Sequence, residues 1–363
     1  MSDWLSPNPP HIATTLVTIK KMNKLIIISI IVFLSSCTNN FEQNISKYFS
    51  LVNKAELEIC QSEFGQALET YEIAFTKIQK PFGKDLFNAA LCSQLSNQIS
   101  NRNKYLQVIV NNSNELEFAK SKFVGTYLTV QEWNQLVSNQ IIDYDPLLRN
   151  EFLEIRERDQ LYRPMYDTHD DTINANRIIN LNRILELTES RGFPSHMELG
   201  FSHYLRGQNH DIVLLHTAQR RSRDKTVMDL EPILFNAVKA GRFDPETAIF
   251  FMNYQQDREK GEFEVYSTDQ FTHPLLPDSL NNKIWLRNLS EQQVTSANST
   301  RKEWYANSLE DIAIKTEYLS TSSIPFVFTC VKKSFGRLGE DFDKETALEQ
   351  YKMATSYMKE YRK

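Results

Sequence analysis

Two residues suited to proton chemistry stand out in the sequence: a histidine that follows an apolar run and an aspartate in a charged helical segment. His216 directly follows the apolar residues Ile212–Leu215, and Asp159 lies four residues before Arg163. Residues four apart share one face of a helix, so the sequence predicts an ion pair between Asp159 and Arg163. A buried imidazole without a partner would cost roughly 1–3 kcal/mol. The residues therefore indicate either a hydrogen-bonded core histidine and a solvated ion pair, or one catalytic cleft that holds both His216 and Asp159.

Familiar catalytic motifs and a plausible metal site are both missing from the sequence. It contains no G-x-x-x-x-G-K-[ST], no H-E-x-x-H and no G-x-S-x-G. His196, His203 and His210 recur every seven residues, but such a step separates helical ligands by about 10 Å. Gly200 and Gly207 would also interrupt any helix that aligned them. We therefore expect no metal and no cofactor, with these histidines at surfaces or interfaces.

The charge balance excludes some classes of partner. The 363 residues include 41 lysines and arginines against 46 aspartates and glutamates, a net charge of −5. Without a polybasic block, a dedicated nucleic-acid binder is not expected. Only ten residues are glycine, so a fold that binds phosphate through glycine loops is not expected either. The basic cluster Arg220–Arg223 with Lys225 indicates a contact with anionic headgroups or an acidic partner, or simply a solvated loop.

The N-terminal region carries the strongest local signal. Within Met22–Cys37, Lys24 precedes the apolar run Leu25–Leu34, and small residues then lead to a cysteine. This order is typical of a secretory signal peptide, and the run is shorter than the roughly 20 residues that a membrane-spanning helix needs. Leu34-Ser35-Ser36-Cys37 resembles a bacterial lipobox. The resemblance implies cleavage before Cys37 and lipid chains, palmitate among them, on the new N-terminal cysteine.

This interpretation divides the first part of the chain. Residues 1–37 are a leader and signal peptide, with translation starting at Met22, and residues 38–44 are a short tether. The lipid would anchor the protein in the cell envelope, facing the periplasm or the cell surface. The other cysteines, Cys60, Cys92 and Cys330, are too widely spaced for a disulfide framework or a zinc site, which leaves a Cys60–Cys92 bridge as an option.

Residues 45–140 have the apolar spacing of paired helices. Helical hairpins are predicted at Phe49–Lys80 and Lys84–Asn111, with a break at Pro81-Phe82-Gly83. The first hairpin is similar to the tetratricopeptide repeat family, in which small residues let two helices approach around an aromatic ring. The residues that carry this similarity are Ala67, Tyr71, Ala74 and Pro81. Lys54 and Ala55 stand where the repeat has a leucine–glycine pair, so a plain helical bundle is the alternative.

Residues 145–311 form a second predicted domain, again mostly helical. Asp145 before Pro146 is a helix N-cap signal, and Ser195 with Glu198 is a capping box. Five motifs in order resemble DUF6624, a bacterial domain family of unknown function. They are Asp159-Gln160 with Arg163, Gly192-Phe193-Pro194, His216 after its apolar run, Gly241, and Tyr266-Ser267-Thr268-Asp269-Gln270.

The resemblance to DUF6624 has consequences for the polar residues. It implies that Asp159, Gln160, Arg163, His216 and Tyr266 hold the most definite positions of the pattern. We expect these side chains to converge on one polar cluster at the centre of the helical domain. The family pattern assigns no chemistry to them.

The expected fold is mainly α. Tetratricopeptide-like hairpins come first, a second mostly helical domain follows, and residues 312–363 form a C-terminal extension with a terminal helix. The exception is at most a small hairpin near Gly261–Phe271, where apolar and charged residues alternate.

The expected function is that of a membrane-anchored envelope lipoprotein that binds a protein or another ligand. It would contact the membrane through its N-terminal lipid and a protein partner in the envelope, and no nucleic acid. The alternative is a hydrolase-type enzyme with its site around His216 and Asp159.

Overall fold

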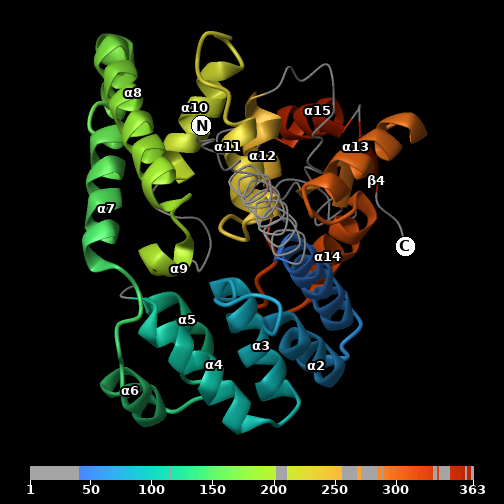
Figure 1. Ribbon diagram of the computed structural model, residues 1–363. Helices are drawn as coiled ribbons and strands as arrows, with labels where there is room; N and C mark the ends of the chain where they lie inside the picture. Colours follow the sequence, from blue (N-terminus) through green and yellow to red (C-terminus); the bar gives the residue numbers. More distant parts are fainter. Residues whose placement is uncertain are drawn as a thin grey trace, which may run out of the picture.

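The computed structural model describes residues 41–113, 116–201, 211–255, 268–270, 284–287, 289–329, 333–334, 344–355 and 358–360. In these ranges the helices pack against one another in pairs, and the strands are few and short (Figure 1). The prediction of a mainly helical fold is therefore confirmed. Cys37 with its lipobox, and Tyr266, lie outside the described residues.

The first group of helices follows the two predicted hairpins. Ser62 and Asn97 adopt φ values of 63° and 59° in the tight turns that reverse the chain within each hairpin. Asparagine is one of the few residues that visits this left-handed region readily. The helices of this group are residues 41–60, α2 (Phe64–Phe75), α3 (Gly83–Leu95), α4 (Ile99–Asn111), α5 (Glu117–Phe123) and α6 (Val130–Ser138).

The core of this first group includes residues from far along the chain. Its buried residues run from Ile45 to Trp133, and the segment Phe326–Phe328 is buried in the same core. The side chain of Asn88 holds this segment through both of its polar atoms. Its amide donates to the Val327 carbonyl over 2.8 Å, and its oxygen accepts from the Val327 amide over 2.9 Å. The late segment is thus an integral part of the early core.

The second group of helices contains Asp159 and His216. The Asp145 side chain accepts hydrogen bonds from two backbone amides in the first turn of the next helix, and Ser195 with Glu198 forms the predicted capping box. Gly192, with a φ of 81°, ends the longest helix. The helices of this group are α7 (Pro146–Gln160), the 3-10 turn η1 (Arg163–Met165), α8 (Tyr166–Arg191), α9 (His196–Leu199), α10 (Asp211–Arg221), α11 (Glu231–Lys239) and α12 (Pro245–Gln255).

Helices α7, α8, α10, α11 and α12 enclose a second apolar core. On α8, Leu181, Ile184 and Leu187 face this core, as their spacing predicts. Ile178 was expected on the same face but is 45% exposed. The reason is helical geometry: four residues before Leu181 the inward position belongs to Arg177, which is buried. A charged side chain therefore extends the apolar face of this helix.

The C-terminal part of the chain adds helices and a small sheet. The sheet has the order β3-β1-β2-β4, with β2 antiparallel to β1 and β4 and with β1 parallel to β3. The expectation of at most one hairpin was wrong, because strands pair with segments that are distant in sequence and leave no local signal. The elements are β1 (Thr268–Gln270), β2 (Ile284–Arg287), α13 (Glu291–Glu303), α14 (Leu309–Thr321), β3 (Lys333–Ser334), α15 (Lys344–Thr355) and β4 (Met358–Glu360).

Four buried charged residues, here called the buried quartet, join α14 to the first group of helices. The Glu56 carboxylate accepts from Lys315 over 2.5 Å and from Lys84 over 3.2 Å, and Lys84 also reaches Asp85 over 2.7 Å. The Tyr48 hydroxyl donates to Asp85 over 2.5 Å. Two positive and two negative charges thus compensate one another in the interior.

Two further observations concern membranes and cysteines. Within the described ranges, no helix combines the length and the apolar character needed to cross a bilayer. Cys60 and Cys92 are both free thiols, so the optional bridge between them is not formed. Cys330 lies outside the described residues.

Candidate functional site

The structure brings Asp159 and His216 into direct contact, although 57 residues separate them in sequence. His216 Nδ1 lies 2.7 Å from Asp159 Oδ2. Arg163 donates to Asp159 Oδ1 over 3.1 Å, and Gln160 donates to Oδ2 over 2.6 Å. Four of the five residues expected in one polar cluster are therefore neighbours, and the fifth, Tyr266, is outside the described part of the chain.

Helix geometry explains how this contact forms. Asp159 is in the last turn of α7 and Arg163 begins η1, so the two side chains lie four residues apart on one side of the chain. His216 is on α10, which packs against both α7 and α8. The apolar residues Val213 and Leu214 are buried in the second core and fix how α10 is turned about its axis. That rotation directs His216 toward Asp159.

The electrostatic environment assigns a protonation state to the pair. Burial alone would raise the pKa of Asp159, but the hydrogen bonds from His216 and Arg163 hold it below its ordinary value. An ionised carboxylate only accepts hydrogen bonds, so the Nδ1 atom of His216 carries the proton in that contact. In the neutral ring, Nε2 is then an acceptor.

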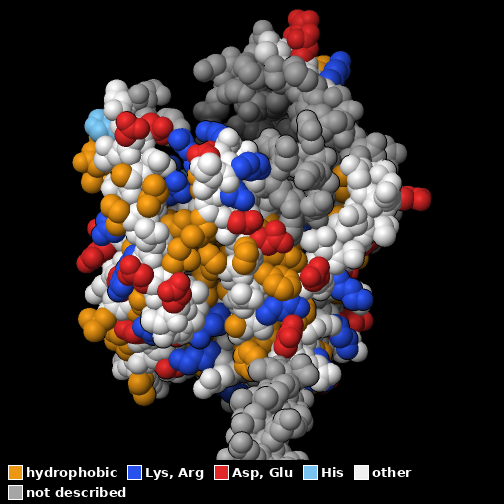
Figure 2. All heavy atoms as spheres, turned by 45° about the horizontal axis from the view of Figure 1, so that its top comes forward, with side chains coloured by type: hydrophobic (Ala, Val, Ile, Leu, Met, Phe, Trp, Pro, Cys, Tyr) orange, Lys and Arg blue, Asp and Glu red, His pale blue; other side chains and the backbone are white. Residues whose placement is uncertain are grey.

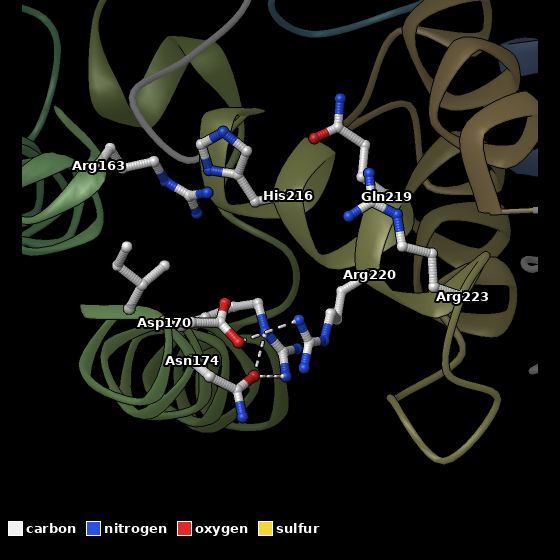
Figure 3. A pocket seen from close by; sticks show the side chains of 9 residues that line it. Arg163, Asp170, Asn174, His216, Gln219, Arg220 and Arg223 are labelled. Carbon is white, nitrogen blue, oxygen red and sulfur yellow. Dashed lines mark hydrogen bonds and ion pairs between the residues drawn. The ribbon is translucent and has the colours of Figure 1, made fainter. Parts of the chain in front are cut away.

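The Asp159–His216 contact lies beside a cavity of about 220 Å³ between α8 and α10. Figure 3 shows Asp170 and Asn174 reaching into it from α8, and His216, Gln219 and Arg220 from α10. In the space-filling view, basic side chains gather where the ends of α8 and α10 come forward (Figure 2). The lining residues are Arg163, Asp170, Ile173, Asn174, Arg177, His216, Gln219, Arg220 and Arg223.

The charges of this cavity, here called the arginine cavity, are unbalanced. Arg163 pairs with Asp159, and Arg220 lies 3.6 Å from Asp170. Among the described residues, Arg177 and Arg223 form no ion pair: Arg177 donates only to the neutral amide oxygen of Asn174, over 2.7 Å and 3.3 Å. The cavity therefore holds more positive charge than its own side chains neutralise.

Arg177 is the most constrained of these arginines. Only 6% of it is exposed. Burial lowers its pKa, and so does the positive charge of Arg220 and Arg163, while Asp224 and Asp159 act in the opposite direction. Asp224 is not part of the cavity wall, and its carboxylate accepts hydrogen bonds from Thr226. A buried guanidinium surrounded by other guanidinium groups marks a region of positive potential.

Sequence reasoning missed the contribution of α8 to this cavity. Asp170, Asn174 and Arg177 follow one another at helical spacing, four and then three residues apart, which was the available signal. The basic cluster was recognised, and its residues divide between two roles. Arg220 and Arg223 line the cavity, whereas Arg221 donates to the carbonyls of Lys225 and Val227.

The other histidines do not form a metal site in the described part of the chain. No group of three histidine, cysteine or acidic side chains there is arranged to hold a metal ion. His196 lies at an interface, with its ring 4.2 Å from that of Phe82 and 5.5 Å from that of Phe201. Burial lowers its pKa to about 3, so it stays neutral. His203 and His210 are outside the described residues.

No protein-family model, no curated protein and no solved structure matches this chain. The similarities to the tetratricopeptide repeat and DUF6624 families therefore stay predictions from short motifs. What the geometry defines is a helical protein with an arginine-lined cavity beside an aspartate–histidine contact.

Proposed function

We propose that this protein is a binding module for a small anionic ligand, which it holds in the arginine cavity. The observation that carries the proposal is the unbalanced charge of four arginines against Asp170 and the already engaged Asp159. Guanidinium groups present paired N–H donors that match the oxygens of carboxylates and phosphates. A ligand with such oxygens would neutralise charge that the protein leaves uncompensated.

The burial of Arg177 supports a ligand rather than a solvated surface. A charged group removed from water is costly unless it is paired and hydrogen-bonded. Arg177 has a single neutral partner, Asn174, and positive neighbours on two sides. An anion at this point would supply the missing negative charge. The cavity volume of about 220 Å³ corresponds to roughly seven waters, at about 30 Å³ each, which suits a small ligand.

Calorimetric titration of the purified protein with single anions tests this proposal. The probes are acetate, sulfate and methyl phosphate at pH 7.5 and fixed ionic strength, because salt screens surface charges. At least one probe should bind, and Arg177→Gln should weaken that binding by tenfold or more. Arg183→Gln is the matched control, since Arg183 lies on the same helix but pairs with Glu151 and Glu186. Equal, weak signals from all probes and both variants would show that the cavity is not a binding site.

A hydrolase is the second candidate, and the Asp159–His216 contact favours it. With its proton held on Nδ1, His216 offers Nε2 as a base that could take a proton from a water molecule attacking an ester. No serine, threonine or cysteine lines the described cavity, so water would be the nucleophile. Turnover of a chromogenic phosphate or carboxylate ester, lost in His216→Gln, would establish this activity. Binding without turnover would leave the binding module alone.

The tetratricopeptide-like architecture is part of the same proposal. Ala67, Tyr71 and Ala74 are completely buried on α2, which packs against α3, and this supports the close helix approach that the repeat requires. Ala67→Leu should then overpack the hairpin and cost about 1–3 kcal/mol in the free energy of unfolding. Tolerance of leucine at this position would favour a plain bundle.

The lipid anchor is proposed from the lipobox residues. Cys37→Ser should prevent acylation and release the protein from membranes, or leave an unprocessed precursor. Metabolic labelling with a clickable fatty acid measures this directly, and equal labelling of wild type and variant would dismiss the anchor. Cross-linking and pull-down from membranes would then identify an envelope protein partner.

A further inference from the structure

The charges in the arginine cavity can be counted individually, and the count restricts the ligand. Asp159 neutralises Arg163, and Asp170 lies against Arg220. Two cavity arginines, Arg177 and Arg223, have no ion-pair partner among the described residues. The uncompensated charge of the lining is therefore two positive units when His216 is neutral. A ligand with two negative charges would balance it.

The position of Arg177 argues that these two charges belong to one compact group. Arg163 and Arg220, which come from η1 and α10, both act electrostatically on the buried Arg177 guanidinium of α8. Three guanidinium groups from three elements thus surround one place rather than a line. An extended dicarboxylate separates its two charges along a carbon chain. A phosphoryl group concentrates two charges on oxygens of a single atom, and its tetrahedral oxygens can meet donors from several directions.

The wall opposite the arginines is suited to a small substituent. Ile173 gives the cavity an apolar patch, and Asn174 and Gln219 add neutral hydrogen-bonding groups. The small volume excludes a large group within the cavity, because a phosphoryl group takes up much of the space. A part of the ligand beyond a few atoms would have to extend through the open side.

We propose that the arginine cavity binds a phosphoryl dianion, either inorganic phosphate or the end group of a small phosphate monoester. This inference rests on the proposed anion-binding function and specifies its ligand class. Arg177 contacts the phosphoryl oxygens from the cavity floor, and Arg223 adds the second uncompensated charge from the rim. Binding needs no glycine loop, which agrees with the low glycine content.

Competition between anions of defined charge and shape tests the proposal. Methyl phosphate, whose second pKa is about 6, and sulfate are compact dianions at pH 7.5. Dimethyl phosphate keeps the tetrahedral shape but carries one charge, and succinate carries two charges that are far apart. Methyl phosphate should bind at least tenfold more tightly than dimethyl phosphate and succinate in calorimetric titrations at equal ionic strength. Inorganic phosphate and methyl phosphate, compared side by side, distinguish the free ion from the ester.

Two variants connect the preference to named residues. Arg177→Gln should reduce methyl phosphate affinity by tenfold or more. Arg223→Gln should reduce the ratio of dianion to monoanion affinity, whereas Arg183→Gln on the outer side of α8 should change neither. Equal affinities for methyl and dimethyl phosphate, or tighter binding of succinate, would overturn the phosphoryl dianion while leaving anion binding intact. Failure of every anion to bind would overturn both proposals.

Discussion

The buried quartet and the arginine cavity are both clusters of charge between helices, but their charge balance differs. In the quartet, Lys84 and Lys315 face the carboxylates of Glu56 and Asp85, and every member is almost completely buried. In the cavity, arginines outnumber carboxylates, and Arg220 and Arg223 reach solvent.

The difference separates a structural use of charge from a binding use. Two charges of each sign satisfy one another in the quartet, so nothing needs to be added, and removal of one member leaves another unpaired in the interior. The cavity keeps an excess of one sign and an opening to solvent. A cluster of this second kind is stabilised by what it binds. The predictions below change one cluster at a time, so that the two uses of charge can be told apart.

The largest effect is expected from Lys315→Met in the buried quartet. The carboxylate of Glu56 would lose its closer partner and remain buried, which should lower the free energy of unfolding by about 3–5 kcal/mol. Denaturation with urea measures this loss. Lys302→Met on the exposed side of α13 is the control and should cost less than about 0.5 kcal/mol. A loss of similar size in both variants would contradict the structural role of the quartet.

Asp159→Asn should cost about 1–3 kcal/mol, because Arg163 and His216 would lose their charged acceptor in a mostly buried place. The effect should not add to that of His216→Ala. A double-mutant cycle on urea midpoints should give a coupling energy of about 0.5–3 kcal/mol. Strict additivity of the two changes would mean that the contact does not contribute to stability.

The quartet should also give stability a specific dependence on pH. Burial raises the pKa of Asp85 from 3.8 to about 6, although Lys84 opposes the shift. Between pH 4 and 6 the folded state therefore holds a proton on Asp85 that the unfolded state releases, so this residue's contribution to stability falls as pH rises through that window.

A pair of proteins measures this contribution. The difference in unfolding free energy between wild type and Asp85→Asn should be larger at pH 4.5 than at pH 7, by about 1–2 kcal/mol. Carboxylates with lowered pKa, Glu56 and Asp159, act in the opposite direction in both proteins and cancel from the difference. A difference that grew with pH would show that Asp85 is ionised throughout.

The smallest change in stability is expected from Arg177→Gln without ligand. The substitution removes a hydrogen bond to Asn174 but also removes repulsion among guanidinium groups, so the unfolding free energy should shift by less than about 1 kcal/mol. Thermal melting with and without phosphate gives the comparison. Phosphate should raise the melting temperature of wild type and not that of the variant. A large loss without ligand would place Arg177 among the structural charges.

Local chemistry made much of the fold predictable. Asp145, Ser195 and Glu198 marked helix starts through capping, and Asp159 with Arg163 followed from helical spacing. The aspartate–histidine contact needed more, because only the need of a buried histidine for a partner and the motif pattern pointed across 57 residues. The lipobox prediction stays untested, since Cys37 is outside the described residues.

Long-range charge pairing could not be predicted in the same way. Nothing near Glu56 in sequence announces Lys315, which is 259 residues further along the chain. Arg177 was also missed, because an arginine four residues before Leu181 is ordinarily expected to point to solvent. Its burial depends on how α8 meets α10, which local periodicity does not determine. Sequence patterns thus located the elements, whereas the excess charge of the cavity emerged only from their packing.

The contacts of Asn88 and Glu56 with residues beyond position 300 have a consequence for synthesis. The first helices leave the ribosome long before Val327 and Lys315 exist, yet 239 and 259 residues separate these partners. Until then, the early helices have an incomplete core and a carboxylate without its closest cation. A nascent chain that stalls before Lys315 would thus be more than a shortened protein: its first half would expose apolar surface and unpaired charge, a state that chaperones and proteases recognise.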